Sequence, residues 1–348
     1  MRAARVGLRC DAGVHTGVGH LVRCVALAEE LFGRGVEVSF FGAVDDVPWA
    51  DAQLADRGFP RYAAPVDASG LVAAAGVHGL DAMVLDSYTL DPAAAAALGA
   101  AGVVTLAIVD GDARGQAADL YLDQNVAAEL CPTAGAADSR RLAGLRYVLL
   151  RDAVLTARPA TAPVPRDVAR PRVLCFAGGT DPFGAVPVLA RLVLATGVPV
   201  DLTAVVARPE LAAAVPTDAP LAGGRVTVLP PTDDLPRLAA VADLVVGAAG
   251  TSTWELLCLG APTALVWVAE NQRHGYGRTV GRGLAVGLGW LGDLRPDQAV
   301  ATLHRLLTVP AERAELAARG WRAVDGRGRA RVADAVLAEV SRRAVARR

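Results

Sequence analysis

Strand-like and helix-like runs alternate along this chain, separated by turns rich in glycine or polar residues. The apolar run Arg5–Cys10 indicates a buried strand, and residues 21–34 carry apolar side chains at helical spacing. The same plan of strand, glycine turn and helix recurs from residue 172 onward. Such alternation is typical of parallel sheets covered by helices. We therefore predict the α/β class for both halves of the chain.

Two domains fit the length of 348 residues, and a proline-rich stretch marks their junction. Residues 159–171 hold four prolines and almost no apolar periodicity, as expected of a linker. We predict an N-terminal domain over residues 1–158, a C-terminal domain over 172–326, and an arginine-rich amphipathic helix over 327–348. Within them, the patterns predict strands at 36–41, 82–85, 103–109, 172–176, 200–206, 244–246 and 263–268, and edge strands at 121–125 and 146–150. They predict helices at 48–57, 68–77 and 233–241, and further helices that begin at Pro92, after Asp181 and near Trp254.

Composition excludes several classes of function. The formal net charge of -1 argues against the basic face that nucleic-acid binding needs. All 35 basic residues are arginines, which excludes a Schiff-base lysine and a lysine-bearing P-loop. The five cysteines form no C-x-x-C pair, no signal-peptide pattern is present, and no apolar run reaches the roughly 18 residues of a membrane span. We expect a reduced, cytoplasmic protein without a membrane span.

Gly17-Val18-Gly19-His20 stands between the first predicted strand and the first predicted helix. Glycine permits positive φ and close approach to the backbone, and a helix N-terminus presents free N–H groups to an anion. His20 can exchange a proton near neutral pH. This stretch predicts a proton-transfer group beside an anion site. His15 lies in the same loop and could share this role or hold it instead.

Further polar stretches follow predicted strands, at the edge where open parallel sheets bind ligands. They are Asp86-Ser87-Tyr88, Gly178-Gly179-Thr180-Asp181, Gly250-Thr251-Ser252-Thr253 and Glu270-Asn271-Gln272. Each alone is equally consistent with a tight turn. Asp86 can cap its turn, and Tyr88 can be a core aromatic residue.

The two glycine-hydroxyl turns of the second half favour a nucleotide diphosphate, because each offers N–H groups and hydroxyls at a helix N-terminus. Glu255 follows the second turn, where a carboxylate either stabilises the helix N-terminus or accepts the two ribose hydroxyls. No zinc-like cluster is present, and Asp110 with Asp112 is a weak cation candidate. We expect no metal and no cofactor.

These residues together resemble a family. Arg9-Cys10-Asp11 and residues 17–23, with Leu27-Ala28, are similar to the opening of the UDP-2,4-diacetamido-2,4,6-trideoxy-β-L-altropyranose hydrolases of the pseudaminic acid pathway. Further matches, in order over about residues 5–290, are Asp86-Ser87-Tyr88, Asp123-Gln124-Asn125, 144–151, Gly178–Asp181 and Asn271-Gln272. Residues 250–262 also resemble the related N-acetylglucosaminyltransferase of peptidoglycan synthesis.

The resemblance implies a GT-B fold, in which two Rossmann-like domains face one another across a cleft. It also implies that the second domain holds UDP with Glu255 on the ribose, that His20 is the catalytic histidine, and that Tyr88 is an active-site tyrosine. Our further substrate-binding candidates are Arg9, Asp11, Gly17, Gly19, Asp86, Gly178, Gly179, Thr180, Asp181, Gly250, Thr251, Ser252, Glu270, Asn271 and Gln272.

The hypothesis is metal-independent hydrolysis of a UDP-linked deoxyamino sugar with inversion at the anomeric carbon. Water attacks that carbon, His20 orients the water and accepts its proton, and the glycine turns stabilise the departing diphosphate. A GT-B glycosyltransferase, with an acceptor hydroxyl in place of water, is the alternative, and a non-enzymatic nucleotide-sugar binder is a third class. The UDP-sugar is the expected partner, and we expect a monomer.

Overall fold

A computed structural model describes residues 2–13, 17–133, 135, 140–164, 168–218 and 223–346. The chain divides into two compact units, residues 1–152 with 326–348, and residues 153–325. Helix α5 (Asp152–Ala157) begins at the boundary between them. The domain and linker boundaries expected at 158, 171 and 326 remain predictions.

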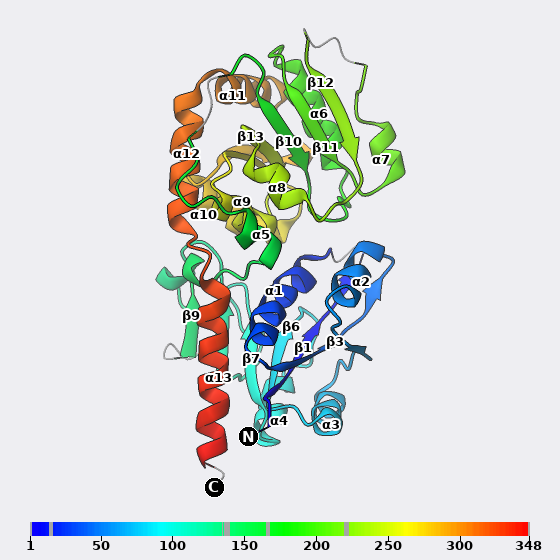
Figure 1. The fold of residues 1–348 in the computed structure, drawn as a ribbon, viewed down its shortest axis with the longest axis vertical. Coiled ribbons are helices and arrows are strands. Elements are labelled where there is room, and N and C mark those ends of the chain that lie inside the picture. The colour runs from blue at the N-terminus through cyan, green and yellow to red at the C-terminus, as the bar shows by residue number, and fades with distance from the viewer. Residues whose placement is uncertain are drawn as a thin grey trace. The chain divides into compact units, whose positions relative to one another are not determined.

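The first unit is built on a parallel sheet of seven strands in the order β5-β3-β1-β6-β7-β8-β9 (Figure 1). The chain moves outward from β1 to β3 and β5, then returns to pair β6 with the other side of β1. The sheet is therefore doubly wound, and its switch point lies between β1 and β6. Its elements are β1 (Arg5–Cys10), β2 (Ala12–Gly13), α1 (Gly19–Gly33), β3 (Glu37–Phe41), β4 (Val44–Asp45), α2 (Pro48–Ala55), β5 (Arg61–Tyr62), α3 (Ala68–His78), β6 (Ala82–Asp86), α4 (Ala94–Ala100), β7 (Val104–Ile108), β8 (Leu120–Asp123), η1 (Ala128–Leu130), β9 (Arg141–Ala143), η3 (Leu145–Tyr147) and α13 (Gly328–Ala346).

Alternating side chains give this sheet two apolar layers. On β6, Ala82 and Val84 pack in the layer that contains α1 and α13, whereas Met83 and Leu85 pack in the layer that contains α3 and α4. Successive side chains of a strand point to opposite faces. Asp86 follows the alternation of Ala82 and Val84, so its carboxylate is directed toward the α1 side.

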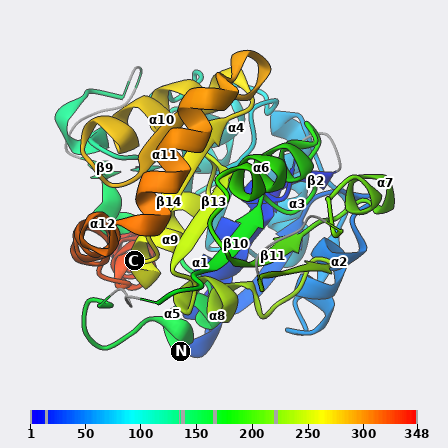
Figure 2. The same ribbon diagram turned by 90° about the horizontal axis from the view of Figure 1, so that it is seen from above.

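The second unit repeats this plan with six parallel strands in the order β12-β11-β10-β13-β14-β15, and its switch point lies between β10 and β13. Helices α6 and α11 pack together on one face (Figure 2). On the other face α10 packs on β14, and α9 contacts both α8 and α12. Its elements are β10 (Arg172–Phe176), α6 (Ala185–Ala195), β11 (Asp201–Val205), α7 (Pro209–Ala213), β12 (Arg225–Leu229), α8 (Leu235–Ala240), β13 (Leu244–Ala248), α9 (Ser252–Leu259), β14 (Thr263–Trp267), α10 (Glu270–Gly281), β15 (Val286–Trp290), η4 (Leu291–Asp293), α11 (Pro296–Thr308) and α12 (Pro310–Ala323).

The predicted α/β class is confirmed, but both predicted edge strands need correction. The strand expected at 121–125 is β8, which is paired on both sides. The strand expected at 146–150 is wrong, because Gly144 at φ 92° leads into the 3-10 turn η3, and β9 just before it forms the sheet edge. The backbone of Val148 then packs so closely on Gly328 of α13 that no Cβ would fit there.

Several features of the second unit differ from expectation, and helices α7, α11 and α12 were not predicted. Strands β12 and β15 were not predicted; β15 reads Val-Gly-Leu-Gly-Trp, and glycine is depleted in strands. The helix expected from Asp233 begins at Leu235, and its N-cap Asp234 makes no side-chain capping bond. Glu270 does not extend β14 but opens α10. None of the helices in the described part of the chain is both long enough and apolar enough to span a membrane.

Candidate active site

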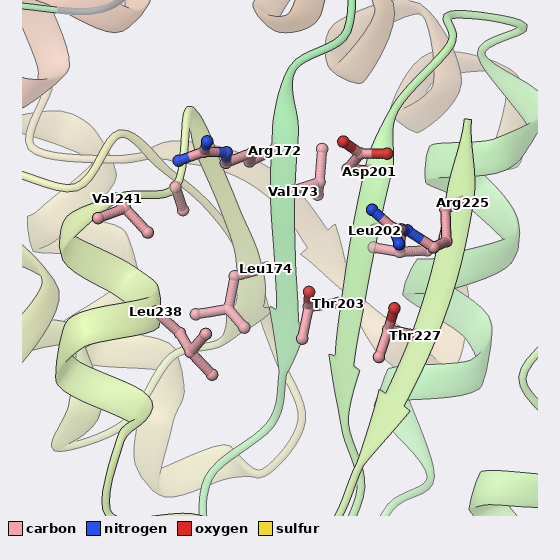
Figure 3. A pocket seen from close by; sticks show the side chains of 11 residues that line it. Arg172, Val173, Leu174, Asp201, Leu202, Thr203, Arg225, Thr227, Leu238 and Val241 are labelled. Carbon is pink, nitrogen blue, oxygen red and sulfur yellow. The ribbon is translucent and has the colours of Figure 1, made fainter. Parts of the chain in front are cut away.

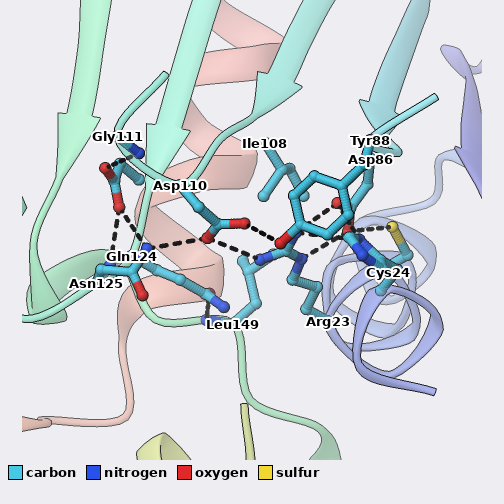
Figure 4. Close-up of polar contacts among 12 residues, drawn as sticks. Arg23, Cys24, Asp86, Tyr88, Ile108, Asp110, Gly111, Gln124, Asn125 and Leu149 are labelled. Carbon is cyan, nitrogen blue, oxygen red and sulfur yellow. Dashed lines mark hydrogen bonds and ion pairs between the residues drawn. The ribbon is translucent and has the colours of Figure 1, made fainter. Parts of the chain in front are cut away.

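The candidate base lies at the switch point of the first sheet. Helix α1 begins at Gly19, so His20 lies in its first turn, three residues after Gly17 at φ 77°. Asp86 is the last residue of β6, the strand on the other side of β1. His20, Arg23 and Cys24 occupy one face of α1, and all three contact the Asp86 carboxylate. Figure 4 shows Arg23 and Cys24 beside Asp86. The positive φ at residue 17 is the feature that requires glycine there.

His20 and Asp86 form a hydrogen-bonded dyad. Nδ1 of His20 lies 2.6 Å from Oδ1 of Asp86, whose side chain is fully buried. A carboxylate only accepts hydrogen bonds, so Nδ1 is assigned the proton at this distance. Nε2 is then the imidazole nitrogen available for other chemistry. His15, the other histidine considered for this role, lies outside the described residues.

Arg23 completes the surroundings of Asp86. Its Nε donates to Oδ2 at 2.6 Å and its Nη2 to Oδ1 at 2.5 Å. Burial alone would raise the pKa of Asp86, but the charges and hydrogen bonds of Arg23 and His20 outweigh it and hold the pKa well below its usual range. Asp86 is therefore a carboxylate at neutral pH despite its burial. The sequence predicts Asp86 as a substrate contact or a turn cap, whereas its oxygens accept hydrogen bonds from His20 and Arg23.

Tyr88 belongs to a second hydrogen-bonded group beside the dyad (Figure 4). Its hydroxyl donates to Oδ2 of Asp110 at 2.6 Å, and Nδ2 of Asn125 donates to Oδ1 of Asp110 at 2.9 Å. The ring meets the His20 ring edge to face, with centroids 4.9 Å apart. Burial, followed by the charge of Asp110, raises the pKa of Tyr88, so its phenol stays protonated. Arg23 links the two groups, since its Nη1 lies 3.6 Å from Asp110.

Arg9 and Asp11 have local structural partners. Arg9 is 1% exposed and donates from Nε to the Pro65 carbonyl at 2.8 Å. Its Nη1 lies 2.7 Å from Oδ1 of Asp11 without hydrogen-bond geometry. The same oxygen accepts the N–H of Ala43 at 3.0 Å. Arg9 therefore contacts the loop that follows β5, and Asp11 joins the loops that follow β1 and β3.

In the second unit, the carboxylate of Asp181, in the turn after β10, accepts hydrogen bonds from the first N–H groups of α6. Asp181, at φ 43°, accepts the N–H groups of Ala185 and Val186 at 2.8 and 3.0 Å. Burial raises the pKa of Asp181, although those N–H groups and Arg208 oppose the shift. Gly178 at φ 69°, Gly179 and Thr180 form the turn itself. The helix N–H groups that we expected to face a diphosphate thus bind Asp181.

The turn after β13 is arranged differently. Thr251 is the N-cap of α9 and makes no side-chain capping bond, and Glu255 lies in the first turn of that helix. The N–H of Gly250 is 3.3 Å from the hydroxyl of Thr253. Gln272 accepts the N–H of Val268 at 3.0 Å and so braces the start of α10.

The remaining two candidates lie beside Gln272, and one of them has an exposed partner. Glu270 and Asn271 are exposed, and Glu270 pairs with Arg273 at 3.2 Å.

Within the described residues, no three His, Cys, Asp or Glu side chains gather as a metal site would require. Asp110 instead serves Tyr88 and Asn125.

A cavity of about 210 Å³ in the second unit lies elsewhere (Figure 3). Arg172, Asp201 and Arg225 stand in register at the amino ends of β10, β11 and β12 and line it together with Leu238 of α8. The turns at 178–181 and 250–253 follow the carboxyl ends of their strands. The cavity therefore lies at the amino ends of the strands, whereas those turns lie at the carboxyl ends. It is not part of the candidate site.

Comparison with known proteins shows the fold. No family model matches the chain, and no curated protein sequence matches it. MurG of Acinetobacter baumannii has a TM-score of 0.69 at 17% identity, covering 96% of this chain and 99% of that one. The calicheamicin glycosyltransferase CalG4 has a TM-score of 0.65 at 17% identity, covering 98% and 99%. The UDP-GlcNAc 2-epimerase of Neisseria meningitidis bound to UDP-GlcNAc has a TM-score of 0.65 at 13% identity, covering 96% and 99%. The chain has the GT-B fold, with two Rossmann-like units.

Proposed function

We propose that this chain hydrolyses a UDP-linked deoxyamino sugar at the anomeric carbon. The observation that carries the proposal is the 2.6 Å contact between Nδ1 of His20 and the buried carboxylate of Asp86, at the switch point of a doubly wound sheet. A histidine held in this way by a carboxylate is suited to general-base catalysis. Support also comes from the GT-B fold, which this chain shares with an epimerase solved with UDP-GlcNAc.

In the proposed reaction, the oxygen of water attacks the anomeric carbon while the bond from that carbon to the diphosphate oxygen breaks. Nε2 of His20 takes the proton of the attacking water, and Asp86 stabilises the resulting imidazolium through Nδ1. The bonding electrons leave with UDP. Attack from the side opposite the leaving group inverts the anomeric centre. The phenol of Tyr88 is fixed by Asp110, and its ring against His20 limits the positions open to the sugar.

We propose the turn after β13 as the principal diphosphate contact, with Gly250, Thr251 and Ser252 at the uncapped start of α9. Glu255, one turn along that helix, would accept the ribose hydroxyls. Because Asp181 already fills the start of α6, residues 178–180 would contribute backbone contacts only. The proposal requires no metal ion for the leaving group.

The sequence resemblance narrows the substrate to the UDP-2,4-diacetamido-2,4,6-trideoxy sugar of the pseudaminic acid pathway. A glycosyltransferase is the alternative, favoured by the similarity of the fold to CalG4. In that case the dyad would deprotonate an acceptor hydroxyl instead of water.

The test is to incubate the full chain with UDP-linked deoxyamino sugars, with and without hydroxyl acceptors, and to follow UDP and free sugar. Release of both without an acceptor supports hydrolysis. Release of UDP only when an acceptor is present supports transfer, and binding without turnover supports a nucleotide-sugar binder.

A further inference from the structure

Arg23 contacts the carboxylate of the His20–Asp86 dyad on the side of Nδ1, away from Nε2 of His20. Its Nε and Nη2 grip the two oxygens of Asp86 with bonds of 2.6 and 2.5 Å, a bidentate pairing in a buried setting. Nη2 also lies 3.1 Å from Nδ1 of His20. His20 and Arg23 are three residues apart, so one turn of α1 carries both the base and the cation that faces its carboxylate.

We propose that Arg23 is a positioning residue that keeps the His20–Asp86 dyad at a single proton, which leaves Nε2 of His20 free to accept another. This inference deepens the proposed function and rests on the role of His20 as base. Arg23 itself does not touch the reacting atoms in this scheme. It acts through Asp86, whose oxygens it holds, and through its charge beside Nδ1.

Counting protons shows why the guanidinium matters. In the native arrangement the dyad holds one proton, on Nδ1. Without the charge of Arg23, a fully buried carboxylate favours uptake of a second proton, because burial disfavours the charged form. That proton either binds Nε2 directly, giving an imidazolium, or binds Asp86, whose O–H then donates to Nδ1 and displaces the first proton to Nε2. Both products carry a proton on Nε2, so either one disables the base.

The neutral groups around the dyad cannot replace this charge. Cys24, on the same face of α1, donates its S–H to Oδ2 of Asp86 at 3.7 Å, and burial raises the pKa of its thiol well above its usual range. Tyr88, from the loop after β6, stays protonated because burial and its neighbour Asp110 raise its pKa. Both groups are uncharged near neutral pH and leave the charge of Asp86 uncompensated.

The other charged groups near the dyad, Asp110 and Arg114, do not compensate the charge of Asp86 either. Asp110, from the turn after β7, is ionised, because Arg23 and the hydrogen bonds from Tyr88 and Asn125 lower its pKa against the effect of burial. A second carboxylate favours protonation of the dyad and so makes the guanidinium more necessary. Arg114 lies over the Tyr88 ring, 4.7 Å from its centroid, and donates from Nη2 to the Ile108 carbonyl. Among the residues that the structure describes, Arg23 makes the guanidinium contact with Asp86.

The test is a pH titration of the full chain labelled with ¹⁵N-histidine, in which NMR reports whether each imidazole nitrogen carries a proton. The signals of His20 are assigned from their loss in His20→Asn. Arg23→Gln removes the charge, Arg23→Lys retains it, and Arg61→Gln is the control, since Arg61 is a half-exposed arginine paired with Asp51 at 2.9 Å. Circular dichroism checks that each variant is folded.

We expect Nε2 of His20 to be free of a proton at neutral pH in the native chain, in Arg23→Lys and in Arg61→Gln. In Arg23→Gln the pH at which the dyad takes up its second proton rises by about 1–3 pH units relative to the native chain. A native Nε2 that carries a proton at neutral pH overturns the inference, and so does an unchanged titration in Arg23→Gln. If Arg23→Gln does not fold, Arg23→Met, which also removes the charge and keeps an unbranched side chain, replaces it with the same expected rise, and an unchanged titration in Arg23→Met overturns the inference. The readout needs no turnover, so failure to hydrolyse UDP-sugars refutes the proposed function separately.

Discussion

Replacing Asp86 by asparagine perturbs the dyad with the smallest possible change in shape. Three nitrogen donors lie 2.5–2.6 Å from the two oxygens of Asp86, namely Nδ1 of His20 and two nitrogens of Arg23, and the Cys24 thiol is a more distant fourth donor. Asparagine offers one oxygen and one NH₂ group. Whichever way the amide is turned, the NH₂ faces an Arg23 donor, and in both orientations the negative charge that stabilises the imidazolium is lost.

The size of the effect follows from this arrangement. General-base catalysis typically contributes ~10²–10⁴-fold, and the loss in His20→Asn sets the upper limit because Asp86 acts through His20. We expect Asp86→Asn to lower kcat by about 10²-fold or more with little change in KM. The double variant should be no slower than His20→Asn alone. Arg23 loses its buried partner and keeps Asp110 at 3.6 Å, so the free energy of unfolding should fall by about 3–5 kcal/mol at most.

The assay measures steady-state UDP release for the native chain, the two single variants and the double variant, with urea unfolding in parallel. Asp119→Asn is the matched control, because Asp119 is a buried carboxylate of the same unit that accepts from Thr105 and pairs with Arg343. It should lose stability and keep kcat. A near-native kcat for Asp86→Asn, or losses that multiply in the double variant, would refute the reasoning.

Three further predictions concern the ribose contact, metal and acid. Glu255→Ala should raise the Kd for UDP and the KM with little change in kcat, measured by calorimetry and kinetics, because ribose contacts are similar in the ground and transition states; a selective loss of kcat would contradict the assignment. Activity should survive EDTA, and loss on chelation with rescue by Mg²⁺ or Mn²⁺ would make Asp110 and Asp112 ligand candidates. Since the pKa of Asp86 is lowered in the folded chain, its contribution to stability is present above the unfolded value of about 3.9 and is lost as pH falls below it; urea unfolding across that range should be less pH-dependent in Asp86→Asn than in the native chain.

Much of the fold could be predicted because binary patterning and turn residues report local structure directly. Apolar runs such as Arg5–Cys10 and Arg172–Phe176 were expected at their observed bounds. Strand β15 escaped notice because two glycines interrupt its pattern. The strand expected at 146–150 failed because Gly144 at φ 92° leads the chain into η3, and the backbone of Val148 beyond it is covered by Gly328, which is distant in sequence.

The candidate site could be predicted in part. His20, Asp86 and Tyr88 could be predicted as candidates because they follow predicted strands of a parallel sheet, and ligands bind at the carboxyl ends of such strands. Arg23 was not proposed as a site residue, because an arginine in an amphipathic helix is normally a surface group, and its carboxylate partner lies 63 positions away. The spacing of three between His20 and Arg23 was the available signal. Asp181 turns into α6 because residue 181 has φ 43°, which the sequence does not reveal.

The central claim is that water attacks the sugar carbon. The most direct measurement is turnover of a UDP-linked deoxyamino sugar by the full chain in ¹⁸O-labelled water without an acceptor, with mass spectrometry of both products and NMR of the newly formed anomer. The account predicts that the label enters the free sugar and not UDP, and that the first anomer formed is inverted. Label in UDP would mean cleavage of a phosphorus–oxygen bond, and no free sugar without an acceptor would mean that the chain is not a hydrolase; either result would contradict the account.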